Sequence, residues 1–169
     1  MQAIAMILIG VWVGWTLFMW FAATRSFRTV DDILSSSNPQ LDETAKPLTP
    51  ERTRLLLRHC ASEINRTYFR AYGWAQVVLG LGVVILLWRA TPRDTFSLTV
   101  AGVMLGLVLL LTFLVTPQII TIGRNIDFVP RTPPPPAMPR FWMLHGAFTG
   151  LDGAKLLAGL VLLGRWIVR

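Results

Sequence analysis

Cysteine, histidine and charge are all scarce in this chain of 169 residues. Cys60 is the single cysteine, so no disulfide can form within the chain, and two histidines are too few for a metal site built from several imidazoles. Charged residues make up 15% of the chain, whereas they are about a quarter of a soluble domain. Together with a hydrophobic content of 53%, these numbers exclude a disordered chain, a disulfide scaffold and an ordinary soluble enzyme, and they indicate a membrane protein.

Sequence motifs for chemistry are also lacking. The chain has no zinc, phosphate-loop or dinucleotide-binding motif, and it shows neither a nucleophile–base pair nor paired catalytic carboxylates. His59 and Cys60 are adjacent, but two ligands do not make a metal site. We therefore expect no enzymatic activity, no catalytic residue and no metal. The net charge of +7 does not indicate a nucleic-acid partner, because eight of the sixteen basic residues lie in 24–70, between two apolar segments.

Four apolar segments predict an all-α fold, a polytopic membrane four-helix bundle forming one domain over 1–169. The first, of twenty-one residues without a charge, is long enough to cross a hydrocarbon layer of ~30 Å at about 1.5 Å per residue. We expect the first segment to be retained rather than cleaved, because Arg25 and Arg28 follow it and no basic residue precedes it. The predicted spans cover 3–23, 72–88, 96–122 and 141–167.

Aromatic side chains near the ends of these spans are expected at the membrane interface. They are Tyr72, Trp74, Trp88, Trp142 and Trp166.

The connections between the spans differ in kind. Thr49 and Pro50 are typical of a helix N-cap and first residue. Arginines then recur at multiples of four beside leucines, which predicts an amphipathic segment over 50–71 that runs directly into the second span. Gly73 is the expected hinge, because glycine costs about 1 kcal/mol relative to alanine in a helix. The proline-rich loop 129–139 is predicted to be a stiff connector.

Basic residues predict the orientation. The segments 24–71 and 123–140 share one side and hold eleven lysines and arginines, whereas the other side holds four. The positive-inside rule places the first side in the cytoplasm and both termini outside it. We expect the bacterial inner membrane as the location.

Ionisable side chains in the fourth span indicate a candidate site. Asp152 lies near its middle and Lys155 one turn later; a charge at that depth costs at least ~2.5 kcal/mol, so both should face the bundle and interact. At 100° per residue, His145 and Thr149 fall close to Asp152 on the helix. Polar residues of the second and third spans are expected to join them. The predicted polar site comprises His145, Thr149, Asp152, Lys155, Thr116, Gln118 and Gln76.

Glycines four residues apart occur in three of the spans. Such pairs let helix backbones approach closely in lipid, and they predict a tightly packed bundle. The pairs are Gly10 and Gly14, Gly102 and Gly106, and Gly146 and Gly150.

Three stretches, Asn65–Phe69, Val115–Ile120 and Phe141–Asp152, carry a resemblance to a known family. A proline near the end of the third span and a Phe-x-x-x-His-Gly sequence at the start of the fourth resemble the transmembrane protein 205 family and its bacterial relatives of unknown function. The resemblance implies a small four-helix membrane protein and brings no established chemistry. Asp152 lies close to the position at which that family typically has an asparagine.

Three functional hypotheses follow. The first is an accessory or scaffolding subunit of a larger membrane protein complex, with lipids and other membrane subunits, or copies of the same chain, as partners. The second is a small transporter or ligand-binding protein that uses His145, Asp152 and Lys155, for which the alternative is a purely structural salt bridge. The third is a protein associated with haem or quinone; no other cofactor is expected.

Overall fold

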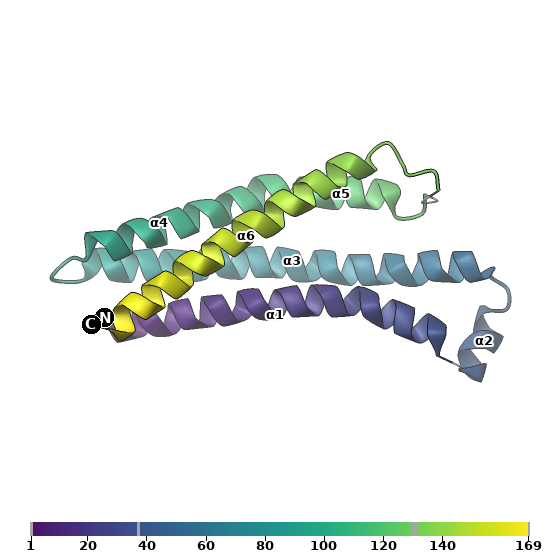
Figure 1. Ribbon diagram of the computed structural model, residues 1–169, viewed down its shortest axis with the longest axis horizontal. Coiled ribbons are helices and arrows are strands. Elements are labelled where there is room, and N and C mark those ends of the chain that lie inside the picture. Colours follow the sequence, from purple (N-terminus) through teal and green to yellow (C-terminus); the bar gives the residue numbers. More distant parts are fainter. Residues whose placement is uncertain (1, 37, 130–131, 169) are drawn as a thin grey trace.

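The computed structural model is built from helices and describes residues 2–36, 38–129 and 132–168. Four helical rods lie alongside one another (Figure 1), and each is long and apolar enough to cross a membrane. The predicted all-α four-helix architecture is therefore confirmed. Pro130, Arg131 and Arg169, which the loop and charge arguments used, lie outside the described residues. The elements are α1 (Gln2–Ser35), α2 (Pro39–Ala45), α3 (Pro50–Arg89), α4 (Thr95–Leu110), η1 (Leu111–Val115), α5 (Thr116–Ile126) and α6 (Met138–Ile167).

The rods alternate in direction, so the connections fall at two ends. Both termini and the turn between α3 and α4 lie at one end, called here the terminal end (Figure 1). Helix α2 and the connection between α5 and α6 lie at the other, called the loop end (Figure 1). Helix α6 crosses α1 and α3 obliquely rather than running parallel to them (Figure 1). This crossing decides which residues of α6 meet α1.

Helix α3 is one continuous helix of 40 residues, as predicted. Thr49 caps it by accepting a hydrogen bond from the Arg52 N–H through Oγ1 at 3.3 Å, and Pro50 occupies its first position. The helix does not break at Gly73, so the predicted hinge is wrong. Gly73 instead permits close packing, because a Cβ placed there would lie 2.9 Å from the Thr112 side chain.

Helix α1 runs twelve residues beyond the predicted span, which ended at residue 23. Hydropathy marks where a helix leaves the apolar layer, whereas backbone hydrogen bonds continue in water. The polar extension lies beside α3, since Asp31 Oδ1 lies 3.9 Å from Arg54 Nη2. The short helix α2 was also not predicted; Asn38 caps it by accepting from two backbone N–H groups.

The third rod contains a π-helical turn, η1, directly before Pro117. The Thr116 N–H donates to the Leu111 carbonyl, five residues earlier. Proline lacks an N–H and crowds the preceding turn of a regular α-helix, and a π turn re-routes the hydrogen bonds at that point. The rod therefore continues to Ile126.

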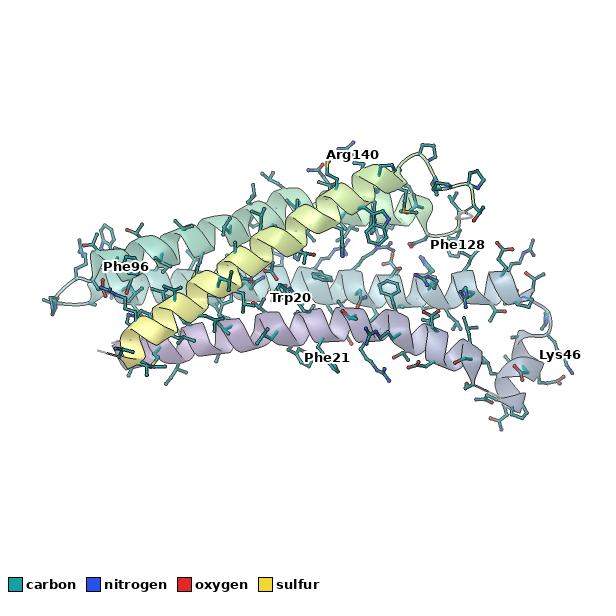
Figure 2. All side chains as sticks on the ribbon, in the orientation of Figure 1. Trp20, Phe21, Lys46, Phe96, Phe128 and Arg140 are labelled. Atoms are coloured by element: carbon teal, nitrogen blue, oxygen red, sulfur yellow. The ribbon has the colours of Figure 1, made fainter. Side chains whose placement is uncertain are left out.

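The core is apolar near the terminal end, where Ile9, Val83 and Leu162 are completely buried. The outer surfaces of the rods are apolar too; Phe21, on the outer side of α1, is 66% exposed (Figure 2). Such surfaces suit lipid.

The aromatic residues near the ends of the predicted spans differ in exposure. Trp74, Trp88 and Trp142 are exposed. Tyr72 and Trp166 are buried instead, because their polar atoms have partners inside: Trp166 Nε1 donates to Ser97 Oγ at 3.0 Å.

Candidate functional site

The centre of the bundle contains a buried ion pair on α6. Lys155 Nζ donates to Asp152 Oδ1, and the two side chains are 1% and 0% exposed. The prediction that both point into the bundle and interact directly is confirmed. Three residues of α1 and α3 form further hydrogen bonds with the pair: Trp20, Tyr72 and Gln76.

Asp152 and the Tyr72 hydroxyl connect α6 to both other helices. Trp20 Nε1 of α1 donates to Asp152 Oδ2 at 2.9 Å, from the inner side of α1 (Figure 2). The Tyr72 hydroxyl lies 3.2 Å from the same oxygen. It also donates a hydrogen bond to Thr16 Oγ1 at 2.9 Å, and it accepts one from Lys155 Nζ at 3.1 Å.

Gln76 completes the network on α3. Its Oε1 accepts from Trp12 Nε1 at 2.9 Å and also from Lys155 Nζ. Among the described residues, the buried side-chain polar atoms without a partner are Asn65 Oδ1 and Arg165 Nε, and neither belongs to this network. A satisfied polar network in a low-dielectric interior fixes the relative positions of the helices that supply it.

The structure divides the predicted polar site. Asp152, Lys155 and Gln76 come together, and Thr116 is buried elsewhere, in a cavity wall. The other three residues, His145, Thr149 and Gln118, are exposed and do not join the network. Gln118 bonds instead to the Leu114 carbonyl and Arg140, and Thr149 to the His145 carbonyl.

The oblique course of α6 explains this division. His145 and Asp152 share a helix face, but α6 meets α1 at Asp152 and borders a cavity at His145. The sequence argument also missed Trp12, Thr16 and Trp20 of α1. Their spacing of four residues is the signal that could have revealed them, because it places all three on one helix face.

The cavity lies toward the loop end, between α1, α3, α5 and α6, and has a volume of about 1000 Å³. Phenylalanines of three helices form much of its wall, whereas Arg54 and Arg58 of α3 border it farther from the apolar span. His145 and Thr116 also line it. Asp152 and Lys155, in contrast, are no more than 1% exposed. The ion pair is therefore closed off from the cavity.

A second ionic cluster joins α3 to the residues around the end of α5. Arg66 donates to Asp127 through both guanidinium nitrogens, at 2.7 and 2.9 Å, and to Glu63 at 2.7 Å. His59 Nδ1 lies 2.8 Å from Asp127 Oδ2. Ligand atoms of His59, Glu63 and Asp127 lie within 4.8 Å of one another. Because Arg66 already bonds to both carboxylates, the arrangement is an ion-pair cluster rather than a metal centre.

Glu63 should make the stability depend on pH below neutrality. It precedes the apolar stretch that begins at Tyr72, and hydrogen bonds from Arg124 and then Arg66 lower its pKa to about 2. Because the pKa of Glu63 is lower in the folded state, its ionisation stabilises the fold above the ordinary pKa of about 4.5. This stabilisation is lost as the pH falls toward 2. We expect Glu63→Gln to remove about 1 kcal/mol or less at pH 7, since the site is partly exposed. The stability difference from the wild type should shrink below pH 4; a constant difference would contradict the assignment.

The six glycines predicted to pack the bundle do not do so. A Cβ added at Gly10, Gly14, Gly102, Gly106, Gly146 or Gly150 would meet nothing within 4 Å in the described part of the chain. The close approaches are at other glycines: an added Cβ would lie 2.9 Å from Trp12 or Leu105 at Gly80, and 2.9 Å from Val13 at Gly159. The prediction of internal packing is therefore wrong, and the three glycine pairs face away from their own bundle.

Comparisons with protein families, curated proteins and solved structures give no match. The fold therefore defines the class by itself, a four-helix membrane protein.

Proposed function

We propose that this protein is a non-enzymatic accessory or scaffolding subunit of a larger membrane protein assembly. The observation that carries the proposal is the outward position of the glycine pairs on α1, α4 and α6. Each glycine in a helix costs about 1 kcal/mol relative to alanine. Within this bundle no neighbouring helix packs closely against these six glycines. A helix of a second protein could pack directly against the exposed backbone.

The closed polar network supports this proposal over a transporter. A transport site needs a path to its ionisable groups, and Asp152 and Lys155 are at most 1% exposed and bonded to each other. Their contacts instead hold α1, α3 and α6 in fixed positions, which is what a rigid docking scaffold requires. Two axial histidine ligands for haem would have to face each other. His59 instead bonds to Asp127.

The resemblance to the transmembrane protein 205 family, whose members are small four-helix membrane proteins, is consistent with this proposal. We also propose the bacterial inner membrane as the location, with the loop end in the cytoplasm. Lys46 and Arg140 both lie at that end (Figure 2), which fits the positive-inside rule.

The orientation predicts the labelling of Cys60, which is exposed near the loop end. A membrane-impermeant maleimide should leave it unlabelled in spheroplasts and label it after lysis. The matched control is Arg93→Cys in a Cys60→Ser background, because Arg93 is exposed in the turn at the terminal end. That cysteine should react without lysis, and the reverse pattern would overturn the orientation.

Photo-crosslinking in native membranes tests the scaffold proposal. A photoreactive residue at Val103, which lies between the α4 glycines and is 57% exposed, should yield one discrete crosslinked product. The same residue at Val78, 68% exposed on α3, is the control and should react mainly with lipid. The product should disappear when Gly102 and Gly106 are both replaced by leucine. A product that survives this change, or no product at Val103, would contradict the proposal.

A further inference from the structure

The cavity near the loop end has the size of a ligand site. Its volume of about 1000 Å³ is at the upper end of the range of ~300–1000 Å³ for small-molecule sites. Glu51 and Phe69 of α3 both line it, and their separation of eighteen positions corresponds to about 27 Å along the helix axis. The cavity is therefore elongated and follows α3.

Polarity changes along this length. The end nearer the membrane span is apolar, with Phe69 of α3, Ile119 of α5 and Phe148 of α6 in its wall. The far end has Arg54 and Arg58, one helical turn apart. Both form an ion pair with Asp31 of α1, at 3.9 and 4.0 Å. Glu51 also lines this end, and the two guanidinium groups are the charged donors there that suit a phosphate.

One polar atom in the wall has no partner. Asn65 is 6% exposed and lines the cavity between the arginines and the apolar end. Its Nδ2 donates to the Ala23 carbonyl, but Oδ1 is buried and unpartnered. Such an oxygen is costly unless it accepts a hydrogen bond. Because this oxygen is buried, the Asn65 amide has to turn toward the cavity before the hydroxyl group of a ligand can donate to it.

The wall also distinguishes a lipid chain from a peptide. Each peptide residue brings a backbone donor and acceptor that need partners when buried. At the apolar end the wall offers chiefly phenylalanine and isoleucine side chains, which cannot pair with a peptide backbone. An alkyl chain needs no such partners and gains by burial against the phenylalanines.

We propose that this cavity binds one single-chain phospholipid. The phosphate lies at Arg54 and Arg58, the glycerol hydroxyl donates to Asn65 Oδ1, and the alkyl chain lies between Phe69 and Phe148. Arg58 and Asn65 are seven residues, or about two helical turns, apart on α3, so one head group reaches both. This proposal is independent of the glycine-mediated assembly.

Native mass spectrometry of the purified protein with three matched amphiphiles tests it. All three carry a 16-carbon chain: a lysophosphatidate has an anionic phosphate and a hydroxyl, hexadecyl phosphate has the phosphate alone, and a lysophosphatidylcholine has the hydroxyl but a zwitterionic head. We expect a one-to-one complex, with lysophosphatidate bound most tightly and lysophosphatidylcholine about tenfold or more weakly. Hexadecyl phosphate should fall between them, because it leaves Asn65 Oδ1 unpaired.

Variants assign the selectivity to the cavity. Arg54→Gln combined with Arg58→Gln should abolish the preference for lysophosphatidate over lysophosphatidylcholine. Ser62→Trp, which fills the cavity from α3, should prevent binding of all three. Arg70→Gln, an exposed arginine on α3 outside the cavity lining, is the matched control and should change nothing. The proposal is overturned if no one-to-one complex forms, if the wild type does not distinguish the head groups, or if the preference survives the double arginine change.

Discussion

Replacing Asp152 with asparagine should lower the free energy of unfolding by about 3–5 kcal/mol, the usual cost of breaking a buried ion pair from one side. The asparagine side chain keeps the shape of the site but leaves the Lys155 ammonium without its counter-charge at a position that is 1% exposed. Denaturant or SDS titration of the purified protein in mild detergent measures the change.

The double variant Asp152→Asn, Lys155→Met is the decisive companion. It removes both charges and keeps most of the side-chain volume, so we expect it to be more stable than either single variant. It should remain below the wild type by about 1–2 kcal/mol, because Gln76 and Tyr72 lose the hydrogen bonds from Lys155. Small, additive losses in the single variants would show that the two charges do not interact.

Replacing Asp127 with asparagine should produce the second largest loss, about 3 kcal/mol. Asp127 holds Arg66 through two hydrogen bonds, and both side chains are at least nine-tenths buried. The change leaves the guanidinium with Glu63 as its remaining acidic partner. It should also loosen the end of α5 against α3, which hydrogen exchange at residues 120–128 would detect.

Glu63→Gln is the matched control for that experiment. Glu63 bonds to the same arginine but is 35% exposed, so its removal should cost about 1 kcal/mol or less. Equal losses for Asp127→Asn and Glu63→Gln would contradict the view that burial makes the Asp127 contact the stronger one.

Much of the fold could be predicted from the sequence because hydropathy and helix signals are local. Four apolar segments indicated four helices, and Thr49 with Pro50 marked the start of α3. The burial of Asp152 and Lys155 also followed from the cost of exposing a charge to lipid. The helical extension of α1 to Ser35 was missed because a hydropathy boundary is not a helix boundary.

The candidate site was harder to predict because it depends on how the helices cross. A tryptophan in an apolar helix is most simply interpreted as a hydrophobic packing residue. The sequence therefore did not indicate that Trp12 and Trp20 donate hydrogen bonds to Gln76 and Asp152. The angle of α6 separates His145 from Asp152 although they share a face. Which glycines pack internally is likewise set by the crossing points, which lie at Gly80 and Gly159 rather than at the regularly spaced pairs.

The mass of the particle extracted from native membranes in mild detergent tests the central claim, that this chain is a subunit assembled through its outward glycine pairs. We predict a discrete particle with more protein than one chain of 18.9 kDa, from which the chain dissociates when Gly102 and Gly106 are both replaced by leucine. An equally stable single chain for both wild type and variant would contradict the account.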